Sequence, residues 1–102
     1  MIFYDFEVFK EDWLAVFIDV TKKKEYVIIN NPDELKALYE ANSKDIWVGY
    51  NNRHYDQYIM KGILLGMNPK RINDWIIVEK KEGWQFSSAF NKVPMINYDV
   101  MP

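Results

Sequence analysis

The sequence predicts a single α/β domain with a mixed sheet and helices on its faces. Three segments rich in β-branched and aromatic residues, at 2–9, 13–20 and 25–30, have the character of strands. The short breaks between them suit hairpin turns, so we expect an antiparallel meander. Later segments alternate between strand and helix patterns, which requires the later strands to run parallel to the first. The 102 residues leave room for one compact domain.

The first helix has a clear start signal. Asn31 is expected to cap it, Pro32 stands at the first helical position, and Glu34 occupies the place of a capping-box carboxylate. The other expected elements are a strand at 46–50, a helix at about 54–65 capped by Gly66, a helix at about 68–80 and a strand at 95–100.

The composition predicts a packed core and excludes several function classes. Hydrophobic residues make up 49% of the chain and aromatic residues 17%, which is enough for a core. The absence of cysteine excludes disulfides and thiolate metal sites and fits a cytoplasmic protein. No apolar run approaches membrane-spanning length. The net charge of −2 gives no general attraction for nucleic acid, so any nucleic-acid role must come from a specific site.

Asp5 and Glu7 are the first candidate site residues. They lie two apart on the first predicted strand, so their side chains share one face about 7 Å apart. The first strand of such a meander is usually central with both faces covered, where two carboxylates would repel each other and lose hydration. A divalent metal ion would compensate both effects. The alternative interpretation is an edge strand with both carboxylates in water.

Asp56 is the third candidate. It precedes Ile59 and Met60 by three and four residues and therefore continues the apolar, core-facing stripe of its predicted helix. The strand before this helix, if parallel to the first, ends where sites of α/β proteins generally lie. The alternative role for Asp56 is to cap the first turn of the helix.

Two motifs, in this order, resemble those of a nuclease superfamily. The segment YDFEVF, with Asp5 and Glu7, resembles the first motif, D-x-E, of the DEDD superfamily of 3′–5′ exonucleases. The segment GYNNRHYDQYIM resembles the second, N-x(2–3)-[FY]-D, with Asn51, Tyr55 and Asp56 in the matching positions. The chain is similar in this respect to the proofreading exonuclease domains of family-B-like phage DNA polymerases, which have a ribonuclease-H-like fold.

The resemblance implies roles for these residues. Asp5, Glu7 and Asp56 would be three of four carboxylates that hold two Mg²⁺ or Mn²⁺ ions, and hard divalent cations prefer such oxygen ligands. Asn51 and Tyr55 would orient the site or contact the terminal nucleotides. Phe6 is also implied as a substrate-binding position, although strand alternation predicts a core location for its side chain. The partners would be a single-stranded DNA 3′ end and the remainder of a polymerase chain.

One part of the family pattern is missing. Nothing after Asp56 matches the third motif, which carries the fourth Asp, so residues 1–102 are predicted to be a partial exonuclease domain, truncated at the C-terminus and weak or inactive alone. Such a truncation would expose apolar surface, so we expect the chain to associate with itself. Two other functions stay open: a non-catalytic ribonuclease-H-like binding module, and another ribonuclease-H-like nuclease.

Other polar residues have simpler interpretations. His54 beside the second motif is expected at the surface or at the helix start, since the resemblance implies no general base there. Asp99 is expected to be a surface or substrate-facing carboxylate. The run from Lys22 to Lys24 is most simply a solvated turn, with a phosphate contact as the alternative.

Overall fold

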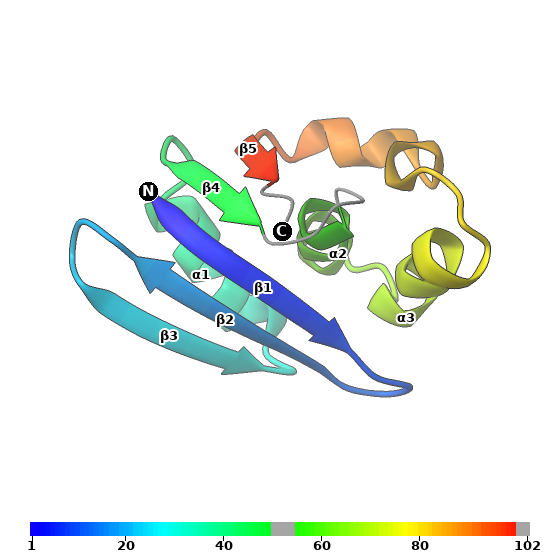
Figure 1. Cartoon of the computed structure of the whole chain (residues 1–102), viewed down its shortest axis with the longest axis horizontal. Helices are drawn as coiled ribbons and strands as arrows, with labels where there is room; N and C mark the ends of the chain where they lie inside the picture. Colours follow the sequence, from blue (N-terminus) through cyan, green and yellow to red (C-terminus); the bar gives the residue numbers. More distant parts are fainter. Residues whose placement is uncertain (50–54, 100–102) are drawn as a thin grey trace.

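A computed structural model of the chain describes residues 1–49 and 55–99, with side chains through residue 98. Its five strands form one mixed sheet in the order β3-β2-β1-β4-β5, with β1 in the centre (Figure 1). β1–β2 and β2–β3 are antiparallel, and β1–β4 and β4–β5 are parallel. The predicted α/β class, mixed sheet and central first strand are confirmed. The strands are β1 (Ile2–Val8), β2 (Trp13–Asp19), β3 (Lys24–Ile29), β4 (Ile46–Gly49) and β5 (Ile96–Asp99).

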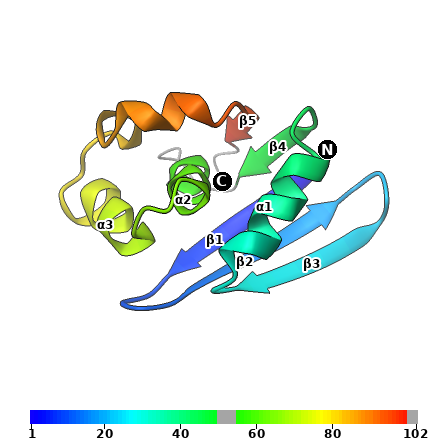
Figure 2. The same cartoon turned by 180° about the vertical axis from the view of Figure 1, so that it is seen from behind.

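Helix α1 (Pro32–Ala41) begins as its sequence predicts. The Asn31 side-chain oxygen accepts a hydrogen bond from the Glu34 N–H at 3.1 Å, and the Asn31 amide donates to the Glu34 carboxylate at 3.3 Å. This reciprocal pair satisfies backbone groups that the first helical turn leaves open. α1 lies behind the sheet in Figure 1 and in front of it in Figure 2, so it covers one face of the sheet.

The core lies on the face that α1 covers. Ile2, Tyr4 and Phe6 of β1 point into it and are each at most 3% exposed. The Tyr4 ring stacks on Phe17 with 6.4 Å between ring centroids and meets Trp47 edge-on at 5.7 Å. Such aromatic contacts add to the free energy gained by removing the rings from water.

The opposite face of β1–β3 is open, which corrects the expectation that both faces of the central strand are covered. Among the described residues, Figure 1 shows no helix in front of these strands. We call this the open face, and none of its side chains is buried. In the cross-strand rows that the pairing defines, it consists of Phe3, Ile18 and Glu25, then Asp5, Val16 and Val27, then Glu7, Leu14 and Ile29.

The helical part beside β1 begins with α2 (Tyr55–Leu64). Gly66 lies just beyond its end, and its φ of +80° is the left-handed conformation expected of a glycine cap. α3 (Pro69–Asn73) packs so closely that a Cβ on Gly62 would lie 2.1 Å from the Ile72 Cδ1. Within the described ranges, no helix combines the length and apolar character needed to cross a membrane.

The helix predicted at about 68–80 is present, but its second half is not a regular α-helix. α3 continues into a π-helical turn, Asp74–Val78, and short 3₁₀ turns follow at Gly83–Gln85 and Ser88–Lys92. The π-turn contains the β-branched run Ile76, Ile77 and Val78, whose side chains crowd a regular α-helix. Only Ile76 of that run is buried, so packing supports the segment on one side alone.

Candidate active site

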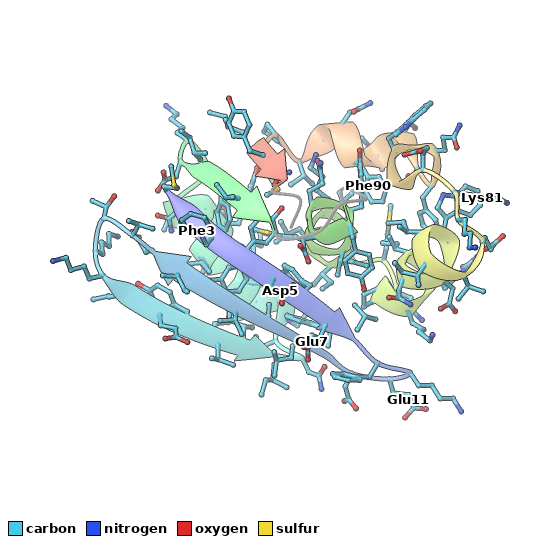
Figure 3. The ribbon with its side chains drawn as sticks, in the orientation of Figure 1. Phe3, Asp5, Glu7, Glu11, Lys81 and Phe90 are labelled. Carbon is cyan, nitrogen blue, oxygen red and sulfur yellow. The ribbon has the colours of Figure 1, made fainter. Side chains whose placement is uncertain are left out.

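Asp5 and Glu7 lie side by side on the open face of β1. Figure 3 shows Phe3, Asp5 and Glu7 following one another along the strand. Their cross-strand neighbours on β2 are Val16 for Asp5 and Leu14 for Glu7. Neither neighbour carries a charge, and neither carboxylate forms an ion pair with a described residue. The two negative charges therefore lie next to each other on a partly apolar surface.

The electrostatics of Asp5 reflect this placement. Partial burial raises the pKa of the Asp5 carboxyl above its ordinary value, and the neighbouring Glu7 charge raises it further. A hydrogen bond with the Phe6 backbone acts in the opposite direction but does not cancel these effects. Both causes of the raised pKa disfavour a second negative charge. A bound cation would relieve both of them.

Asp56 reaches β1 from the first turn of α2. Its side chain is fully buried, as the helical stripe predicts, and its Oδ1 accepts a hydrogen bond from the Phe6 N–H at 3.0 Å. The Met1 carbonyl accepts from the N–H of Val20, the residue just after β2, so alternation directs the Phe6 N–H to the β4 side of β1. The pairing with β4 ends at Tyr4 opposite Gly49, so Asp56 takes the next amide along this edge.

The two sequence motifs therefore meet at one residue. Phe6 stands between Asp5 and Glu7, and its amide is bound by a carboxylate that lies 50 residues further along the chain. However, the part of the chain that the structure describes contains no group of three Asp, Glu, His or Cys side chains placed to hold one metal ion. Asp5 and Glu7 offer paired oxygen ligands on the open face, whereas Asp56 Oδ1 is directed at the backbone.

Tyr55 connects the site to α3. It is only 5% exposed, and its hydroxyl donates to the Asn73 side-chain oxygen at 2.6 Å. Asn73 in turn donates to Asp74 at 3.2 Å, and Lys70 forms an ion pair with the same carboxylate at 2.6 Å. Burial, followed by the charges of Asp56, Asp5 and Asp74, raises the pKa of the Tyr55 phenol well above its usual range. A neutral, buried hydroxyl tied to α3 holds the start of α2 in place.

The remaining candidates divide into two groups. Phe6 is 3% exposed and packs against Trp13 and Phe17, so its side chain belongs to the core and its amide to the site. Asn51 and His54 lie outside the described residues. No sequence pattern indicated a role for Asn73 or for the backbone amide of Phe6, because both act through tertiary contacts.

A shallow hollow of about 220 Å³ adjoins Asp5 on the open face. Phe3, Val16 and Ile18 are its apolar lining residues, and Asp5 lines it as well. A larger hollow of about 860 Å³ lies in the helical part and is lined by residues 66–87, with none of the three candidate carboxylates among them. Size alone does not mark a site, and the smaller hollow is the one next to the charged pair.

Comparison with known proteins provides no relative. No known protein family, curated protein or solved structure matches this chain. The geometry of Asp5, Glu7 and Asp56 is therefore the basis for assigning a function.

Proposed function

We propose that the chain is the N-terminal part of a metal-dependent 3′–5′ exonuclease domain of the DEDD superfamily, of the proofreading kind attached to DNA polymerases. The observation that carries this proposal is the hydrogen bond from the Phe6 N–H to Asp56. It joins the second motif to the residue between the two acids of the first. If the D-x-E segment and Asp56 were unrelated, a hydrogen bond between Asp56 and the residue between the two acids would not be expected.

The topology supports the same proposal. An antiparallel meander, a helix, and then parallel strands added on the far side of β1 give the order 3-2-1-4-5, which is typical of ribonuclease-H-like domains. Fold alone does not give function, since one fold serves many chemistries. The position of the carboxylates on the central strand makes this topology relevant to catalysis.

The residues present fit a divalent metal ion in part. Asp5 and Glu7 supply hard, mutually repelling oxygen ligands of the kind that Mg²⁺ and Mn²⁺ prefer. When bound, such an ion activates a water molecule and stabilises the negative charge that develops on a cleaved phosphodiester. The hydrogen bond between Asp56 and the Phe6 N–H fixes the position of α2 along β1. The hydrogen bond from the Tyr55 hydroxyl to Asn73 fixes α2 against α3. The apolar hollow beside Asp5 offers a surface for the sugar and base of a 3′-terminal nucleotide.

A second function, a non-catalytic binding module with the same fold, has one observation in its favour. The described residues contain no three-ligand metal cluster, and the open face is largely apolar. Such a module would bind its partner equally well with and without a divalent ion. The exonuclease proposal requires the opposite.

The experiment uses a single-stranded oligonucleotide labelled at its 5′ end, with its affinity measured by fluorescence anisotropy with and without Mn²⁺. We expect Mn²⁺ to tighten binding to a free 3′-hydroxyl end, and Asp5→Asn or Glu7→Gln to remove that gain. Glu11→Gln is the matched control, because it removes the same charge from the hairpin tip, beyond Glu7 and away from Asp5 (Figure 3). Blocking the end with a 3′-phosphate tests end recognition.

The outcomes separate the two functions. Affinity that is independent of Mn²⁺ and unchanged by Asp5→Asn would favour the binding module. Gel analysis of the same mixtures shows whether the label moves to shorter products, which Asp5→Asn must abolish if the cleavage belongs to this chain. The same proposal places the protein in the cytoplasm, where it would act together with the remainder of a polymerase chain.

A further inference from the structure

The outer edge of β3 is a long strand edge that no described strand covers. The Asn30 N–H donates to the Trp13 carbonyl on the β2 side at 3.2 Å. Backbone groups alternate in direction along an antiparallel strand, so those of residues 25, 27 and 29 point outward. β3 therefore presents a row of N–H and C=O groups that another strand could pair with.

The middle of this edge carries no feature that would prevent pairing. Natural edge strands usually have a lysine, a proline or a bulge at such a position. Here the segment from Tyr26 to Ile29 is uncharged and apolar or aromatic, and it continues the β2 pairing without a bulge. Val27 and Ile29 are 52% and 57% exposed. A strand added at this edge would cover part of both side chains.

The two ends of β3 carry opposite charges. Lys22, Lys23 and Lys24 stand at its start, all three exposed, and they outnumber the exposed Glu25 beside them. At its other end, exposed acids gather around Asn30 and Asn31. Asp12 accepts a hydrogen bond from the Asn30 side chain at 2.7 Å, and Glu34 accepts one from Asn31 at 3.3 Å. Asp33, beside Glu34, is exposed as well.

We propose that β3 pairs antiparallel with β3 of a second copy of this chain, centred on Val27. This register places the lysine end of each strand beside the acidic end of the other, so the attraction occurs twice. Parallel pairing would place like charges together. A two-fold arrangement uses the same patch on both copies and closes, which gives a dimer and not a fibre. The dimer does not depend on metal binding at Asp5.

The geometry has a consequence for the open face. The two-fold axis of an antiparallel strand pair is perpendicular to the sheet, so both open faces lie on the same side of the dimer. The Asp5–Glu7 pairs of the two copies then face the same way, one in each half of one continuous sheet. This arrangement distinguishes an edge-paired dimer from one in which two open faces cover each other.

A charge exchange tests the pairing directly. One variant carries Lys23→Glu and Lys24→Glu, and the other carries Asp33→Lys and Glu34→Lys. Each variant alone places like charges at both ends of the dimer, so sedimentation equilibrium should show a monomer. Mixed together, the two restore opposite charges at both ends and should form a heterodimer whose stability falls with added salt. Circular dichroism of each variant verifies that it is folded.

Two further variants separate the edge from the open face. Val27→Pro removes an outward N–H and leaves the β2 pairing intact, so the dimer dissociation constant should rise about tenfold or more. Ile18→Lys places a charge on β2, the middle strand of the open face, and should leave the dimer unchanged. A wild-type chain that stays monomeric at the highest concentration would overturn the proposal. So would a dimer broken by Ile18→Lys and spared by Val27→Pro, or a mixture no more dimeric than its separate components.

Discussion

The two faces of β1 differ sharply although they alternate residue by residue. Ile2, Tyr4 and Phe6 are almost fully buried against α1 and α2, whereas Asp5 and Glu7, on either side of Phe6, are exposed on the open face. The buried face explains why the strand is central and rigid. The open face explains why charged groups can be displayed from it without being buried. A single strand therefore serves both stability and the proposed chemistry, with the Phe6 amide as the point where they meet.

The largest expected difference between the faces is in stability. Phe17→Ala, on the buried face of β2, should lower the free energy of unfolding by about 3–5 kcal/mol, because it leaves a cavity among Tyr4, Phe6 and Trp47. Val16 directly precedes Phe17 and lies on the open face, so Val16→Ala should lower the free energy of unfolding by less than about 1 kcal/mol. Urea unfolding of both variants measures the difference. Similar losses would mean that the open face is covered in solution.

The second-largest expected effect is the loss of stability when the hydrogen bond between Asp56 and the Phe6 N–H is removed. Asp56→Ala should cost about 1–3 kcal/mol, because it leaves the Phe6 amide buried without its acceptor. Asp56→Asn keeps an oxygen acceptor and should cost less. Hydrogen exchange of the Phe6 amide, followed by NMR, reports on the contact itself and should become faster in the alanine variant. An unchanged exchange rate would show that Asp56 does not hold this amide.

Tyr55 provides a smaller test of whether the site depends on support from α3. Tyr55→Phe removes the hydroxyl that donates to Asn73 and should cost about 1 kcal/mol of stability. Because that hydroxyl is directed at α3, Mn²⁺-dependent affinity for DNA should fall much less than in Asp5→Asn. A loss of affinity equal to that of Asp5→Asn, with normal stability, would instead make Tyr55 a substrate contact.

The smallest expected effect is the pH dependence that Asp5 contributes. Its folded-state pKa is raised, so the ionised carboxylate destabilises the fold above that pKa. This destabilisation is relieved as the pH falls through the raised pKa toward the ordinary value near 3.8. Asp5→Asn should therefore stabilise the chain at neutral pH by less than about 1 kcal/mol and lose this advantage in acid. Thermal unfolding at several pH values, with Glu11→Gln as the control for net charge, measures it.

Local signals in the sequence predicted the local structure well. The Asn31 cap, the Gly66 cap and the strand meander each depend on neighbouring residues, and each is confirmed. The burial of Asp56 followed from helical periodicity. The open face could not be predicted, because alternation shows which residues share a face and not what covers that face.

The geometry of the site was predictable only in part. That Asp5 and Glu7 share a face follows from the strand period. The bond between Asp56 and Phe6 depends on β4 ending at Gly49, and strand ends are set by tertiary packing. The π-turn after Asn73 and the Tyr55 contact have the same origin, since both require α2 and α3 to pack before they can form.

The central claim, that the acids of the open face bind a divalent ion, is tested most directly by Mn²⁺ titration with NMR. Mn²⁺ broadens the signals of nearby nuclei, so the amides of Asp5, Phe6 and Glu7 should broaden first, followed by that of Asp56. Asp5→Asn should abolish this pattern, and Glu11→Gln should leave it intact. Broadening centred instead on the acids around Asn30, or unchanged by Asp5→Asn, would contradict the account.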